Sequence, residues 1–182
     1  VMAPKNLWEL RDMLDFAMTY ERPLAIRYPR GQAYRGLKEF EAPIVYGKGE
    51  MIFEEEDYAL LAVGSMVSTA EHVREKWKEA GYSCSLANGR FVKPVDTELL
   101  DRLAERHGRL VTLEENVLQG GYGLAVTAYI HEHYPWIKVL NIALPDAYVE
   151  HGNVSRLREC LGIDSDSVVR RMREFFLERR DG

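Results

Sequence analysis

Residues 58–116 constrain the fold more than any other stretch, because they repeat one pattern. Three short apolar runs each end in a glycine or a polar turn, and a stretch of helical periodicity follows the first and the second. The runs are residues 58–63, 83–88 and 110–113. Strand, turn and helix in alternation are typical of a parallel sheet with helices packed on it. We therefore predict an α/β fold.

Apolar positions at helical spacing extend the pattern to the C-terminal side. The predicted helices are residues 66–80, 97–107, 122–133 and 154–161, and a last one from Ser165; a fourth strand is predicted over residues 136–144.

Consecutive right-handed crossovers would bring the ends of these strands to one edge of the sheet. Those ends are residues 64–65, 89–90, 114–115 and 144–145. Ligands of open parallel sheets gather at the carboxyl ends of the strands. We therefore look for functional residues at this strand-end edge.

Residues 1–31 are predicted to form a helix and then a strand, with no sheet of their own. Asn6 can cap the helix, and Glu9 stands three residues later, as in a capping box. Residues 24–28 form a short β-type run that Pro29 closes. Because the chain starts within an element, we expect a piece of a longer protein.

Residues 32–41 show no hydrophobic periodicity, and we interpret them as a linker. Two short apolar runs follow, at residues 44–46 and 51–53, with Gly47 and Gly49 between them. This arrangement predicts either a hairpin or a sharp turn.

Composition excludes several classes of protein. Hydrophobic residues make up 46% of the 182 residues and charged residues 29%, which is ordinary for a globular protein. The formal net charge of −5 gives no basic footprint for nucleic acid. No apolar run reaches the roughly 20 residues of a membrane helix. Cys84 and Cys160 form no disulfide pattern, and we expect reduced thiols and a cytoplasmic location.

Glu114 and Glu115 are the acidic candidates at the strand-end edge. With the following G-G-x-G at residues 120–123, they could bind a metal or a phosphate. Two carboxylates disfavour a phosphate, and the glycines match neither a Walker nor a Rossmann loop. A role in a turn or an interface is therefore favoured.

The histidines and serines give weaker signals. His131 and His133 are two residues apart and do not share a helix face, which argues against a joint metal site. His151 could be a general base, but no nucleophile is near it in sequence, so a turn is favoured. Ser65 and Ser68 lack a nucleophile-elbow motif.

Arg30 is placed differently, just past the predicted strand and between Pro29 and Gly31. Proline fixes its own φ, so the turn is restricted. An arginine held there can take a phosphate or a carboxylate with its planar fork. A plain surface arginine remains the alternative.

Several phrases, in this order and spacing, resemble the C-terminal part of the 1-deoxy-D-xylulose-5-phosphate synthases, which are transketolase-like thiamine-diphosphate enzymes. The phrases are V-M-A-P (1–4), A-I-R-Y-P-R-G (25–31), R-F-V-K-P-V-D (90–96), T-L-E-E-N (112–116), G-G-Y-G (120–123), L-P-D (144–146) and E-H-G (150–152). The resemblance covers essentially the whole chain. Gly89 and Val95 depart from the usual residues of the family.

The resemblance implies a domain organisation. Residues 1–31 would be the tail of the pyrimidine-binding domain, a helix–strand remnant. Residues 32–41 would be the linker, and residues 42–182 the transketolase C-terminal domain. That domain is expected to be a three-layer α/β/α sandwich with a mixed, mostly parallel sheet and one antiparallel strand.

The resemblance also implies an activity for the full-length parent. That enzyme condenses pyruvate with glyceraldehyde 3-phosphate and releases CO2, which feeds isoprenoid, thiamine and pyridoxal synthesis. It uses thiamine diphosphate and Mg and is a homodimer. The G-D-G metal motif is absent from this sequence. We therefore predict a chain that is inactive alone and binds no cofactor.

The resemblance assigns one substrate contact to this chain: Arg30 would anchor the phosphate of the acceptor. We expect Arg90, Glu114, Glu115 and His151 to form contacts between domains or subunits, because no acid–base pair or nucleophile accompanies them. The alternative is a free-standing, non-catalytic α/β module that binds an anion or a partner protein at its strand-end edge.

Overall fold

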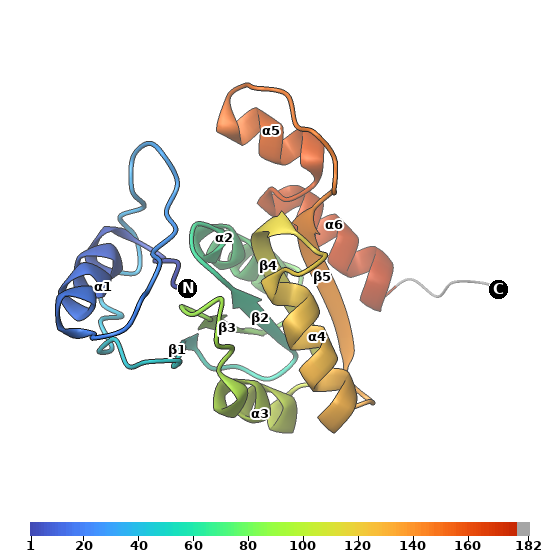
Figure 1. The fold of residues 1–182 in the computed structure, drawn as a ribbon. Helices are drawn as coiled ribbons and strands as arrows, with labels where there is room; N and C mark the ends of the chain where they lie inside the picture. The colour runs from blue at the N-terminus through green and yellow to red at the C-terminus, as the bar shows by residue number, and fades with distance from the viewer. Residues whose placement is uncertain (178–182) are drawn as a thin grey trace.

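The structure, a computed structural model that describes residues 1–177, has one five-stranded sheet with helices around it (Figure 1). The elements are α1 (Leu7–Thr19), β1 (Glu50–Phe53), β2 (Tyr58–Ala62), α2 (Met66–Glu79), β3 (Cys84–Asn88), α3 (Thr97–Arg106), β4 (Arg109–Val117), α4 (Tyr122–His133), β5 (Lys138–Leu144), α5 (Val154–Leu161) and α6 (Ser165–Phe176). Within residues 1–177 no helix has the length and apolar character to cross a membrane.

The sheet has the strand order β1-β3-β2-β4-β5 and is mixed. The pairs β2–β3, β2–β4 and β4–β5 are parallel, and β1 alone runs antiparallel, along β3. The predicted α/β class and the mostly parallel sheet with one antiparallel strand are therefore confirmed. Because the four parallel strands point the same way, their carboxyl ends share one edge, as predicted.

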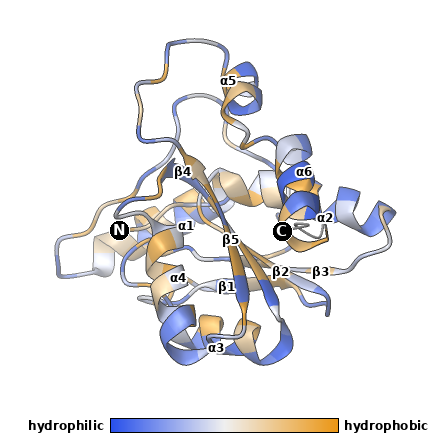
Figure 2. Ribbon diagram, turned by 90° about the vertical axis from the view of Figure 1, so that its right-hand side faces the viewer, coloured by the Kyte–Doolittle hydropathy of each residue, from blue (hydrophilic) through white to orange (hydrophobic). Residues whose placement is uncertain are grey.

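Alternation along β2 divides the core into two layers. Leu60 faces α2 and α6, while Leu61 faces α3 and α4. Both side chains are fully buried, and each contributes roughly 1.5–3 kcal/mol of transfer free energy. Figure 2 shows hydrophobic residues gathered in the strands at the centre of the molecule. This is the expected three-layer α/β/α arrangement.

For residues 1–31 the predicted helix is confirmed and the predicted strand is not. Asn6 caps α1, since its side chain accepts from the Glu9 backbone N–H at 2.9 Å. Residues 24–28 form no regular strand, which corrects the prediction. Only Ile26 forms a β-bridge, to Met2, because the ladder bonds on this side are limited to those of Met2 with Ala25 and Arg27.

Residues 44–53 form the predicted sharp turn but not a hairpin. The Lys48 N–H donates to the Val45 carbonyl at 3.0 Å, and Gly47 has a φ of 71°. β1 then pairs with β3 instead of folding back on residues 44–46. The two apolar runs therefore face different partners.

Candidate functional site

A cleft of about 1160 Å³ opens between the N-terminal segment and the strand-end edge. Three parts of the chain line it: the start of α1 with the residues before it, the stretch 28–34 that carries Arg30, and residues from the sheet edge, α2 and α5. In Figure 1 α1 lies to one side of the sheet and α5 projects beyond its upper end. A smaller hollow of about 220 Å³, lined in part by Arg27 and Gly64, adjoins it at Ser65 and Glu115.

Glu115 forms the polar wall of this cleft. Its carboxylate accepts from the Ser65 hydroxyl at 2.6 Å and from Arg158 Nε and Nη2, both at 3.1 Å. Burial raises the pKa of Glu115, but the bonds from Arg158 and Ser65 outweigh it and leave the pKa below its ordinary value. The carboxylate is therefore ionised and held by a two-pronged arginine contact.

Glu114, the adjacent residue, points into the protein and contacts no other predicted site residue. Its fully buried carboxylate accepts from the backbone N–H groups of Tyr122 and Gly123 at 2.9 and 2.7 Å, so it caps the start of α4. Burial raises its pKa more than these two bonds lower it. A Cβ at Gly121 would lie 2.6 Å from the Glu114 carboxylate. The glycine-rich phrase therefore makes room for an internal carboxylate.

Arg90 is also buried, with 1% exposure, and lies away from the cleft wall. Its Nε donates to Glu9 at 2.6 Å, and its Nη atoms donate to the carbonyls of Pro43 and Ala42 at 3.0 and 2.7 Å. Nη2 also lies 3.1 Å from Glu50. Its backbone φ of 50° is unusual for a residue with a side chain. Arg90 thus ties the end of β3 to two earlier segments.

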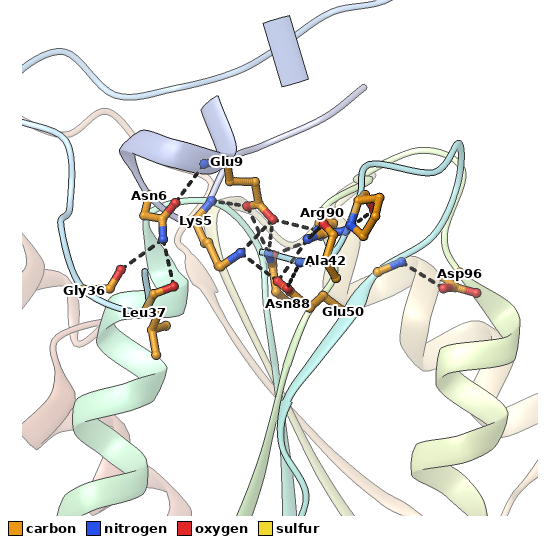
Figure 3. Close-up of polar contacts among 12 residues, drawn as sticks. Lys5, Asn6, Glu9, Gly36, Leu37, Ala42, Glu50, Asn88, Arg90 and Asp96 are labelled. Carbon is orange, nitrogen blue, oxygen red and sulfur yellow. Dashed lines mark hydrogen bonds and ion pairs between the residues drawn. The ribbon is translucent and has the colours of Figure 1, made fainter. Parts of the chain in front are cut away.

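Four further residues complete this buried ion cluster (Figure 3). Lys5 Nζ donates to Glu9 at 3.0 Å and to Glu50 at 2.7 Å, and Asn88 Nδ2 donates to Glu9 at 2.8 Å. The two cations and two carboxylates balance in charge, as burial requires. We define Lys5, Glu9, Glu50, Asn88 and Arg90 as the buried ion cluster.

Four of these five residues were not predicted as site residues from the sequence; Arg90 alone was. Glu9 appeared only as a capping-box residue, and its carboxylate accepts from the Lys5 backbone N–H at 2.6 Å in place of the expected Asn6 N–H. The pairing Glu9–Arg90 spans 81 residues of sequence, which no local pattern signals.

The remaining candidates are exposed. Arg30 lines the cleft and has no hydrogen bond or ion pair to another residue within 1–177. His151 lies on the loop before α5 and is not among the residues that line the cleft. His133 Nδ1 is bonded to the Tyr129 carbonyl of its own helix at 2.9 Å. The structure therefore places Arg30 and Glu115 at one cleft. Arg90, Glu114 and His151 do not line this cleft.

A metal centre does not fit the described part of the chain. Residues 1–177 hold no group of three or more His, Cys, Asp or Glu side chains placed to bind an ion. Glu114 and Glu115, the adjacent acidic pair, point to different partners, a helix terminus and an arginine. We therefore assign no residue to Mg or to thiamine diphosphate.

Comparison with protein families and curated proteins gives a consistent result. The family model "Transketolase, C-terminal domain" matches residues 47–168. The chain is 48% identical over 170 residues, 93% of its length, to the 1-deoxy-D-xylulose-5-phosphate synthase of Lachnoclostridium phytofermentans. It is 41% identical over 175 residues, 96% of its length, to that of Heliobacterium modesticaldum. In each case the chain spans 27% of the relative's length.

Solved structures support the same fold. A split-gene transketolase, solved as an inactive β4 tetramer, superposes with a TM-score of 0.89 at 27% identity, over 98% of this chain and 58% of that one. The transketolase of Campylobacter jejuni superposes with a TM-score of 0.68 over 95% of this chain and 26% of that one. At 17% identity the second shows the fold alone.

Proposed function

The chain belongs to the transketolase C-terminal domain family, and from this membership we propose that it is the C-terminal part of a 1-deoxy-D-xylulose-5-phosphate synthase. The observation that carries the proposal is the 48% identity to such an enzyme over 93% of the chain. The parent would be a thiamine-diphosphate- and Mg-dependent transferase that joins pyruvate to glyceraldehyde 3-phosphate with loss of CO2. Its cytoplasmic location and its homodimeric state belong to the same proposal.

In this proposal residues 1–31 are the tail of the pyrimidine-binding domain, residues 32–41 the linker and residues 42–182 the C-terminal domain. The parallel β-bridge between Met2 and Ile26 supports the first assignment, because it lies outside the five-stranded sheet and is the pairing expected at the edge of a second sheet. The upstream domains of the same enzyme would be the partners of these residues.

Arg30 contributes the one substrate contact that we assign to this chain. Its side chain is exposed at the cleft and carries no carboxylate partner within residues 1–177. A guanidinium in that state can donate two parallel bonds to the phosphate of glyceraldehyde 3-phosphate. Its contribution is binding and orientation of the acceptor, not proton transfer.

In this proposal Arg90 has a structural role as part of the buried ion cluster. Glu115 has a structural role in the wall of the cleft. Arg90 is bonded to Glu9, which supports the proposed contact between residues 1–31 and the C-terminal domain. The bonds of Glu114 and Glu115 lie within residues 42–182 and give no such support. His151 remains a proposed contact to another domain or subunit, since it is exposed on its loop.

Inactivity of the chain alone is part of this proposal, and two observations support it. Among residues 1–177, Glu115 is the one carboxylate that lines the cleft, and no histidine lines it. Glu115 is already bound by Arg158. The split-gene transketolase that resembles this chain is itself described as an inactive β4 tetramer. An acid–base centre would have to come from outside the chain.

A free-standing binding module is the second candidate. One observation favours it: Arg30 lines a cleft of about 1160 Å³ and has no carboxylate partner within residues 1–177, so its guanidinium could take an anion. Inorganic phosphate is the simplest probe of that function.

The two candidates are separated by a calorimetric titration of the chain with thiamine diphosphate and Mg, followed by a CO2-release assay with pyruvate and glyceraldehyde 3-phosphate. The first candidate predicts neither binding nor turnover for the chain, and turnover for the full-length protein. Phosphate binding by the chain, together with a full-length protein that releases no CO2, would favour the second. Turnover by the chain alone would contradict the assigned inactivity.

A further inference from the structure

The loop that carries Arg30, residues 28–33, has both ends bonded to one short stretch of chain. Before the loop, the Met2 N–H donates to the Ala25 carbonyl and the Arg27 N–H donates to the Met2 carbonyl, each at 2.8 Å. After the loop, the Leu7 N–H donates to the Tyr34 carbonyl at 3.1 Å. The position of the loop therefore depends on residues 2–7.

Asn6 adds a side-chain attachment to these backbone bonds (Figure 3). Its Nδ2 donates to the carbonyls of Gly36 and Leu37 at 3.0 and 3.2 Å, while its Oδ1 caps α1. Asn6 is only 5% exposed, so these bonds have little competition from water. Leu37 is buried and has a φ of 54°, a strained backbone that needs fixed partners.

The stretch that holds the loop is in turn fixed to the sheet. Glu9, one turn into α1, accepts from Lys5, Asn88 and Arg90. The Ala3 N–H also donates to the Arg90 carbonyl at 2.8 Å. A continuous series of polar contacts, buried where it leaves β3, thus runs through the start of α1 to the chain on both sides of Arg30.

We propose that Asn6 is a positioning residue for Arg30: its side-chain amide couples the cap of α1 to the stretch after the Arg30 loop and so fixes where the guanidinium meets the acceptor phosphate. This inference rests on the proposed function of Arg30. A displacement of about 1 Å at a binding group can cost a large factor in rate, so loss of this coupling is measurable.

The test uses Asn6→Asp in the full-length protein. Aspartate keeps the cap of α1, because it is as good an N-cap as asparagine, but it removes the two amide donations. The KM for glyceraldehyde 3-phosphate should rise roughly tenfold, while the KM for pyruvate changes by less than about twofold. With unphosphorylated D-glyceraldehyde as acceptor, kcat/KM should stay within about twofold, because no phosphate is there to be positioned.

Two further variants control for folding and charge. Asn6→Ser keeps a cap and adds no charge, so it should show the same acceptor selectivity. Asn153→Asp makes the same change at the cap of α5, where Oδ1 accepts from Ser155 and Arg156, and should behave as wild type. Equal losses with both acceptors in the Asn6 variants, or no loss, would overturn the inference.

Amide hydrogen exchange of the full-length protein tests the coupling without any activity. Residues 30–37 should exchange faster in both Asn6 variants and not in Asn153→Asp. Unchanged exchange there would overturn the inference by itself. A wild-type enzyme that releases no CO2 would instead overturn the proposed function, and exchange would still decide whether Asn6 holds the loop.

Discussion

The ends of β3 and β4 lie on the same edge of the sheet, yet their charged residues serve different purposes. At the end of β3, Arg90 is fully buried and binds carboxylates from α1 and β1. In the second half of β4, which runs on to Val117, Glu114 caps the next helix and Glu115 reaches the cleft. The polar residues at this edge therefore do not form one site. Where a segment of the chain covers them they anchor that segment, and where they stay open to the cleft they can contact a ligand.

The covering segment explains the contrast physically. α1 and residues 1–5 lie over the β3 end, exclude water and leave its charges dependent on one another. The side chain of Glu115 keeps 30% exposure and that of Arg158 21%, so water shares their charges. Removal of one partner should therefore lower the free energy of unfolding far more for a buried ion pair than for an exposed one.

The largest expected effect is therefore at Arg90. Arg90→Ala removes one cation and leaves Glu9 and Glu50 facing a single lysine, so the free energy of unfolding should fall by about 3–5 kcal/mol. Urea unfolding of the chain measures this loss. Arg102→Ala is the matched control, because Arg102 is exposed and pairs with Glu54; it should cost at most about 1 kcal/mol.

One result in the proposed full-length synthase would contradict a purely structural role for Arg90. If Arg90→Ala abolished turnover and left thermal stability and oligomeric state unchanged, Arg90 would be part of the chemistry. The comparison between the two strand ends would then be wrong.

The second prediction concerns pH and the neighbours Glu114 and Glu115. Glu114 has a raised pKa, so its stabilisation is fully present below about pH 4.5 and declines as pH rises through the folded pKa. Glu115 has a lowered pKa, so its stabilisation is present above about pH 4.5 and is lost as pH falls through the folded pKa. The two residues should therefore show opposite pH trends.

Urea unfolding of Glu114→Gln and Glu115→Gln at several pH values checks this. The cost of Glu114→Gln should reach roughly 1–3 kcal/mol and shrink as pH rises, because a buried N–H loses its acceptor. The cost of Glu115→Gln should be at most about 1 kcal/mol and shrink as pH falls. Parallel trends would mean that the two carboxylates share one environment.

Much of this organisation could be predicted from the sequence. Hydrophobic periodicity located α2, α3 and α4 to within a residue or so, because each packs one apolar face on the sheet. The strand-end edge followed from right-handed crossovers. The antiparallel β1 came only from the family resemblance, since its four residues give no direction on their own.

The buried ion cluster could not be predicted in the same way. Lys5 and Glu50 are 45 residues apart, and each taken alone resembles an ordinary surface charge. Their burial depends on how α1 lies on the sheet, which no local pattern encodes. Arg30 was easier to single out, because Pro29 and Gly31 mark its turn in the sequence itself.

The smallest expected change in stability, and the sharpest in function, is at Arg30. Arg30→Ala should alter the free energy of unfolding by less than about 0.5 kcal/mol, because the side chain is exposed at the cleft. In the proposed full-length synthase it should lower kcat/KM for glyceraldehyde 3-phosphate by roughly ten- to a hundredfold, which corresponds to one or two charged hydrogen bonds.

Arg35→Ala is the control on the same stretch of chain, because Arg35 is exposed but does not line the cleft. It should leave both stability and kcat/KM unchanged within about twofold. Equal losses from the two variants would point to general electrostatic attraction of the anionic acceptor. A loss confined to Arg30 would instead place the bound phosphate at the cleft and support the proposed role of Arg30.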